Sequence, residues 1–121
     1  GLRDKFKQLS REIKTVYIDD LKENIYLRKM NGAERVKYLS ILNKNDDAAA
    51  FEAQDYILAA SICESDGKRL YSDDELDKVG EEIPAHIIDA IVKEIAKYNG
   101  FGVDELKQEV KNSEPTQKSD S

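Results

Sequence analysis

Residues 61–102 read SICESDGKRLYSDDELDKVGEEIPAHIIDAIVKEIAKYNGFG, and the rest of the chain is organised around this stretch. Asp66-Gly67 is typical of a tight turn, because glycine adopts positive φ freely and aspartate bonds its own backbone. Residues 68–71 follow as a short extended segment. The stretch has no pattern of catalytic residues, so we expect it to serve as a scaffold.

Two helix signals come next. Ser72 and Glu75 have the spacing of a capping box, in which a hydroxyl and a carboxylate each bind a free backbone amide at the start of a helix. Pro84 opens a second helix. Asn99-Gly100 is typical of its end, where glycine takes the left-handed conformation.

The helix that begins after Pro84 carries the expected core. Its apolar residues recur at helical spacing and predict the central buried face of the domain. They are Ile87, Ile91 and Ile95, with Ile88 and Val92 beside them, and Ile83, just before Pro84, continues the same face.

Residues 2–13 predict an amphipathic helix whose apolar stripe spans an arc of about 60° at ~100° per residue. The stripe consists of Leu2, Phe6, Leu9 and Ile13. The opposite, basic side consists of Arg3, Lys7, Arg11 and Lys14. Two interpretations stay open. The stripe packs on the domain's own core, or the helix docks on an anionic membrane or an acidic partner.

A hairpin follows this helix. Residues 15–18 and 25–28 alternate apolar side chains with Tyr17 and Tyr26, which predicts two strands joined by the polar residues 19–24. An isolated hairpin is marginal in water, so it must pack on helices or pair with another strand. Its free edge is also a place where another subunit could add a strand.

Two helices occupy the middle of the chain. Asn31 and Glu34 predict a capping box for the first, and Asp46 or Asp47 starts the second, which runs to about Cys63. The buried face of the first is predicted at Val36, Tyr38, Leu39 and Leu42, and that of the second at Phe51, Leu58 and Ile62. Alanines favour the second helix and allow a neighbour to approach closely; they are Ala49, Ala50, Ala53, Ala59 and Ala60.

The fold class is therefore mainly α (α+β): a small helical domain with one β-hairpin near the N-terminus. We expect a single domain over residues 1–111, which includes the N-terminal amphipathic helix, the hairpin and a last short helix at 103–111. Residues 112–121 contain no apolar side chain and predict a disordered C-terminal tail.

Composition narrows the class of protein. The chain has 121 residues, 40% hydrophobic and 36% charged, which suits one domain with a modest core. The net charge of −6 is concentrated in residues 61–121, with 8 Lys/Arg against 15 Asp/Glu. This argues against nucleic-acid binding, which needs clustered cations. No apolar run approaches the ~20 residues that span a bilayer, so we expect no membrane partner.

Residues for reaction chemistry are sparse. His86 is the only histidine and Cys63 the only cysteine, so neither has a partner of its own kind for a metal site or a disulfide. Aligning the acidic loop with a calcium-binding EF-hand, with Gly67 at the sixth position, leaves Ile62 at the first ligand position and Leu70 at the ninth. We expect no enzyme activity, no cofactor and no metal.

Two segments together resemble the tail assembly chaperones of long-tailed bacteriophages. The first, residues 24–35, reads NIYLRKMNGAER and is similar to that family's extended segment with an arginine, its small-residue turn and its helix-opening glutamate. The second, residues 60–76, reads ASICESDGKRLYSDDEL and resembles the family's helix end, Asp-Gly turn, aromatic residue and acidic cap. The resemblance covers roughly residues 15–110 and rests on the order and spacing of ordinary caps and turns.

The resemblance implies a non-enzymatic assembly factor of a siphovirus-type phage or prophage. Such proteins bind the tape measure protein, keep it soluble and help recruit tail tube subunits in the bacterial host cytoplasm, and are absent from the mature virion. Many copies coat one client, which implies a homo-oligomer. In many members a ribosomal frameshift adds a domain, and residues 112–121 are where it would join here.

We expect partner contacts on the amphipathic helix and the hairpin. The predicted contact residues are Leu2, Phe6, Leu9, Ile13, Tyr17, Tyr26 and Arg28. For self-association, the acidic half of the chain is a third candidate surface, because it could receive the basic helix of another copy. A second function stays open: a small intracellular adaptor or regulatory protein that binds one partner through the hairpin edge or the basic helix.

Overall fold

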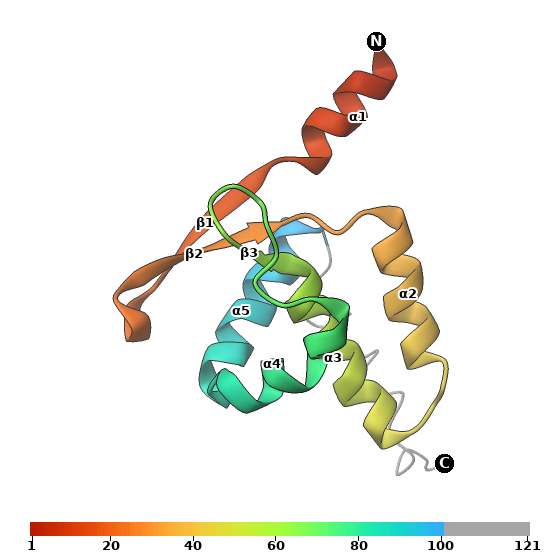
Figure 1. Ribbon diagram of the computed structural model, residues 1–121, viewed down its shortest axis with the longest axis vertical. Coiled ribbons are helices and arrows are strands. Elements are labelled where there is room, and N and C mark those ends of the chain that lie inside the picture. The colour runs from red at the N-terminus through yellow and green to blue at the C-terminus, as the bar shows by residue number, and fades with distance from the viewer. Residues whose placement is uncertain (101–121) are drawn as a thin grey trace.

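The computed structural model describes residues 1–100, and the helix predicted at 103–111 and the tail predicted at 112–121 lie outside this range. Five α-helices and a three-stranded antiparallel sheet of order β1-β2-β3 make up the described part (Figure 1). The helices are α1 (Leu2–Ser10), α2 (Gly32–Leu42), α3 (Asp47–Ser61), α4 (Leu76–Glu82) and α5 (Ala85–Tyr98). The strands are β1 (Ile13–Ile18), β2 (Glu23–Arg28) and β3 (Ile62–Cys63), and the predicted mainly α class is confirmed.

Each strand of the hairpin begins two residues earlier than the alternation alone indicated, at Ile13 and at Glu23. β1 and β2 pair antiparallel from Ile13↔Arg28 to Ile18↔Glu23, and a short 3-10 turn at Asp19–Leu21 closes the loop. Lys22 completes the turn with φ of 52°, in the left-handed region. The hairpin buries Ile18 and Leu27 against the helices.

The N-terminal helix is shorter than predicted. α1 ends at Ser10, and Ile13 is the first residue of β1, so the prediction that Ile13 completes the helical stripe was wrong. Ile13 pairs with Arg28 across the hairpin, and a β-branched side chain fits a strand better than a helix. Long-range strand pairing therefore overrides the local helical spacing.

The third strand is absent from the sequence prediction. The helix predicted to run to about Cys63 ends at Ser61, and Ile62-Cys63 pairs with Tyr26 and Leu27. A two-residue strand directly after a helix has no periodicity of its own. Cys63 of this strand also forms an isolated antiparallel β-bridge with Arg69, so the extended segment expected at 68–71 contacts the sheet.

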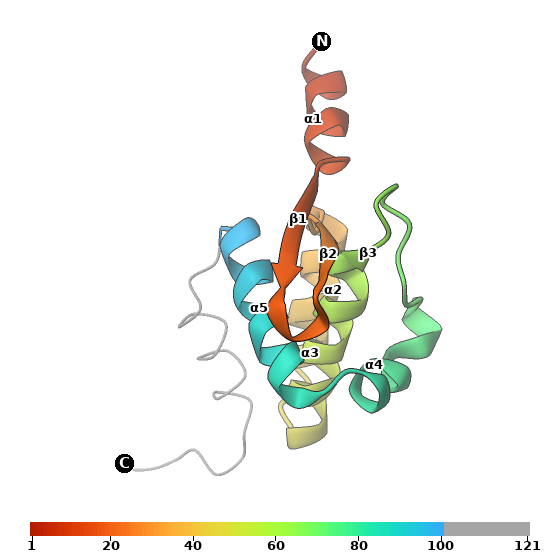
Figure 2. The same cartoon turned by 90° about the vertical axis from the view of Figure 1, so that its left-hand side faces the viewer.

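The main core lies between the inner face of the hairpin and helices α3, α4 and α5 (Figure 2). The predicted face of α5 is confirmed: Ile87, Ile88, Ile91 and Ile95 are buried, and Ile83 and Val92 pack against them. The other buried members of this cluster are Ile18, Leu27, Leu58, Ala59, Ile62 and Val79.

A second cluster joins α2 to α3. Its buried residues are Tyr38, Ile41, Leu42, Ala53, Tyr56, Ile57, Ala60 and Ala96. The predicted face of α2 is only partly correct, because Val36 is 67% and Leu39 38% exposed. On α3, Phe51 is 62% exposed, against prediction. All five predicted alanines of α3 are buried, as close helix approach requires.

The local caps form largely as predicted. Asn31 and Glu34 make a capping box, and the Asp46 carboxylate accepts from the Ala49 amide at 2.7 Å. Glu75 accepts from the Ser72 amide at 3.0 Å, although its turn is a short 3-10 segment that leads into α4. Gly67 and Gly100 adopt φ of 91° and 80°, the left-handed conformations expected at the turn and at the end of α5.

Truncating the core face of α5 tests this packing. Ile91 is 3% exposed, so Ile91→Ala should lower the free energy of unfolding by about 2–5 kcal/mol through lost burial and a new cavity. Urea unfolding followed by circular dichroism measures it. Val36→Ala is the matched control, with an expected change within about 0.5 kcal/mol at a 67% exposed site. Equal effects from the two substitutions would contradict the assigned face.

Candidate functional site

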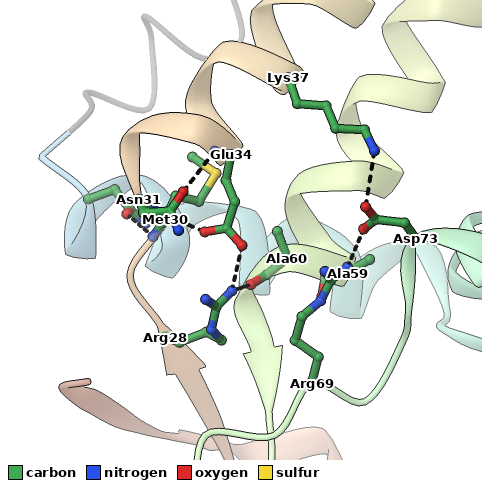
Figure 3. Close-up of polar contacts among 10 residues, drawn as sticks. Arg28, Met30, Asn31, Glu34, Lys37, Ala59, Ala60, Arg69 and Asp73 are labelled. Atoms are coloured by element: carbon green, nitrogen blue, oxygen red, sulfur yellow. Dashed lines mark hydrogen bonds and ion pairs between the residues drawn. The ribbon is translucent and has the colours of Figure 1, made fainter. Parts of the chain in front are cut away.

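A polar junction holds the sheet against the helices (Figure 3). At the end of β2, the Arg28 guanidinium donates to the Glu34 carboxylate at 2.9 Å and to the carbonyl oxygen of Ala60. Glu34 also accepts from the Asn31 amide at 2.9 Å, which completes the cap of α2. Arg28 therefore links β2, α2 and the end of α3, and its side chain is only 20% exposed.

A second arginine caps the same helix end. Arg69 donates through Nε to the Ala59 carbonyl at 2.9 Å and through Nη2 to the Asp73 carboxylate at 2.8 Å. Lys37 on α2 donates to Asp73 at 3.0 Å. The bond from Arg69, and then that from Lys37, lowers the pKa of the Asp73 carboxyl. The carbonyls that α3 leaves unpaired thus receive charged donors, because the chain enters β3 without a glycine cap.

The N-terminal helix α1 carries an exposed apolar stripe. This helix projects away from the rest of the domain in both views, and none of its residues is buried (Figures 1 and 2). Leu2, Phe6 and Leu9 are 67%, 61% and 51% exposed and lie on one side of the helix. The packed-stripe interpretation is thus wrong for the described chain: the stripe faces solvent.

A groove runs along the free edge of β1, and we call it the β1/α5 groove. It is a hollow of about 250 Å³. Its lining residues are Val16, Tyr17, Ile18, Asp19, Asp20, His86, Ile87, Ala90 and Glu94. β1 is the outer strand of the sheet, and Tyr17 on it is 56% exposed. The groove combines an apolar floor with three carboxylates.

Each carboxylate of the groove has a basic side chain beside it. Asp20 contacts His86 at 2.8 Å, Asp19 contacts Lys22 at 3.1 Å, and Glu94 contacts Lys14 at 3.5 Å and Lys97 at 3.6 Å. The His86 side chain is 67% exposed. The contacts of Asp19 and Asp20 are exposed, and exposed pairs contribute about 0–1 kcal/mol each, so these two carboxylates exchange readily to other partners. The Glu94 side chain is only 25% exposed.

The described residues offer little reaction chemistry. Within residues 1–100, no group of three or more His, Cys, Asp or Glu side chains has the geometry to hold a metal ion. Cys63 is buried in β3, and burial raises the pKa of its thiol and disfavours the nucleophilic thiolate. Over the same residues, no helix has the length and apolar character that crossing a bilayer requires.

The predicted contact residues divide into three groups. Leu2, Phe6, Leu9 and Tyr17 are exposed, Ile13 and Tyr26 are half-buried in the hairpin, and Arg28 is engaged inside the fold. The structure places Tyr17 in the groove and leaves the α1 stripe at a distance on its own projection (Figure 2). Sequence reasoning missed the groove, because its two walls lie about 70 residues apart in the chain.

A small domain with an open groove and a solvent-facing amphipathic helix has surfaces suited to protein contact. No protein-family model matches the chain, and no curated protein matches it. Among solved structures, the chain is similar to the tail assembly chaperone of bacteriophage HK97, with a TM-score of 0.59 and 18% identity. The similarity covers 78% of this chain and 93% of the HK97 chain, so the two share a fold, and the resemblance noted in the sequence is confirmed at that level.

Removing the Arg28 guanidinium should loosen the junction. Arg28→Met keeps the aliphatic stem and should cost about 1.5–3 kcal/mol of unfolding free energy, because the Glu34 carboxylate and the Ala60 carbonyl lose a charged donor. Lys22→Met, which breaks the exposed pair with Asp19, is the control and should change stability by under about 0.5 kcal/mol. Urea unfolding compares them, and a loss at Arg28 no larger than the control's would overturn the assignment.

Tyr71 should make stability depend on alkaline pH. Burial, and then the hydrogen bond from its hydroxyl to Glu82 at 2.9 Å, raises the pKa of Tyr71 to about 12. The unfolded value is about 10, so the neutral phenol stabilises the fold fully below about pH 10. This contribution is lost as pH rises toward 12.

The measurement is the stability difference between the wild type and Tyr71→Phe across this pH range. The wild-type advantage should shrink as pH rises from about 10 toward 12. A pH-independent difference for Tyr71→Phe would contradict the assignment.

Proposed function

We propose that this protein is a non-enzymatic tail assembly chaperone of a long-tailed phage or prophage. In this role it binds the tape measure protein, keeps it soluble and helps recruit tail tube subunits. The observation that carries the proposal is the fold shared with the HK97 tail assembly chaperone over 93% of that chain. The proposal places its action in the host cytoplasm during assembly, with the protein absent from the mature virion.

The described surface supports a binding role. A client that is long and aggregation-prone needs a binder that presents apolar side chains to it while remaining soluble itself. The α1 stripe presents three such side chains, and basic residues on the same helix and a net charge of −6 on the whole chain favour solubility. Coating such a client takes several copies, so homo-oligomerisation is part of the proposal.

Co-expression with the client tests the function. The client is the very long, helix-rich protein expected to be encoded immediately downstream, and a slippery heptamer is expected near the end of this gene. Soluble client should rise several-fold when this chain is present and the two should co-purify. A client that stays insoluble and does not co-purify would overturn the chaperone role.

The matched variants sharpen this test. Phe6→Ser removes an apolar side chain from α1, and Phe51→Ser removes one of equal exposure from α3, at 61% and 62%. We expect soluble client to fall with the first and to change little with the second. A stable complex with one host protein, together with no effect on the client, would favour the adaptor function instead.

A further inference from the structure

We propose that α1 of one copy docks into the β1/α5 groove of a second copy, giving a head-to-tail array. The proposal deepens the homo-oligomer part of the proposed function by naming both surfaces. It concerns the chain alone, so it is testable without the client.

The two surfaces match in size. An α-helix rises about 1.5 Å per residue, so the nine residues of α1 span about 13 Å. The groove follows β1 from Val16 to Ile18 and the 3-10 turn to Asp20, about 11 Å at ~3.3 Å per strand residue and ~2 Å per 3-10 residue. It follows α5 from His86 to Glu94, about 12 Å. One helix of this length therefore covers the groove from end to end.

The two surfaces also match in polarity and charge. The stripe of Leu2, Phe6 and Leu9 can cover the apolar floor formed by Val16, Ile87 and Ala90. Lys5 lies about 70° from the stripe at ~100° per residue and can reach the rim of the groove, which carries Asp19, Asp20 and Glu94, whereas Arg3 and Lys7 lie farther round the helix. Docking exchanges the weak exposed pairs of Asp19 and Asp20 for contacts with the docked helix and removes apolar surface from water.

The chain's own α1 is poorly placed to fill its own groove. Only Arg11 and Glu12 separate α1 from β1, and α1 leaves the sheet at the Ile13 end. The groove lies toward the opposite end of β1, near Asp20, and α1 points away from it (Figure 2). Each copy thus carries a helix at one end and a groove at the other. When the helix of one copy binds the groove of the next, the contact is heterologous, and it propagates into an open array or closes into a ring.

Analytical ultracentrifugation of the purified chain tests the contact. The mean mass of the wild type should rise with concentration, more steeply at low than at physiological ionic strength, because the charges are exposed. Phe6→Ser should weaken self-association by about ten- to hundredfold, the loss expected for an apolar side chain that no longer becomes buried. Phe51→Ser is the control of equal exposure and should associate like the wild type.

Mixing two variants distinguishes this mode from others. The helix variant carries Phe6→Ser and Leu9→Ser, and the groove variant carries Tyr17→Ser and Asp20→Lys, all at exposed positions. Each should be monomeric alone, with an unchanged circular dichroism spectrum. Their mixture should form a dimer and stop there, because one intact helix and one intact groove remain.

Three results would overturn the proposal. They are a wild-type chain that stays monomeric at high concentration and low salt, a folded helix variant that associates like the wild type, and a mixture that stays monomeric. A chain that associates as described but fails to solubilise its client would leave the array standing and count against the chaperone role alone.

Discussion

The fold depends on what happens where α3 ends. The chain passes from Ser61 straight into β3, so the last carbonyls of the helix have no glycine turn to satisfy them, and two arginines from distant segments do so instead. Arg28 comes from the hairpin and Arg69 from the loop after β3. A guanidinium suits this task, because it stays charged and its fork of donors reaches a carbonyl and a carboxylate together. The same two side chains therefore cap α3, fix the start of α2 through Glu34, and hold Asp73 at the approach to α4.

This arrangement explains which parts of the fold the sequence could predict. Caps and turns depend on residues within four positions of one another, and the Asn31 box, the Asp46 cap and the Gly67 turn all formed. The isoleucine face of α5 could also be predicted from local sequence, because its apolar residues keep a regular helical spacing along the whole helix. Ile13 and β3 were missed because their conformation is set by partners in the hairpin, about 15 to 40 residues away.

Exposure was harder to predict than conformation. Val36 and Phe51 lie on helices that were correctly predicted, but both side chains are exposed. In the α2–α3 contact the buried residues are Tyr38 and Ile41 of α2 and the alanines of α3. Small residues let the two backbones approach closely. The shape of the neighbouring helix therefore determines how each helix is rotated about its own axis. Hydropathy alone carries no information on that rotation. The candidate surface shows the same limit, since the α1 stripe was visible in the sequence and the β1/α5 groove was not.

The exposure of α1 is compatible with a stable domain because the core closes without it. Both buried clusters draw only on residues from Ile18 onward, so α1 contributes no buried side chain to them. An isolated helix of nine residues is marginal in water, because helix nucleation is costly and few hydrogen bonds repay it. Its apolar face stabilises the helix only when another surface covers it and removes it from water. A short amphipathic helix outside a closed core thus has its stability coupled to binding, and any partner that covers Leu2, Phe6 and Leu9 also stabilises the helix that presents them.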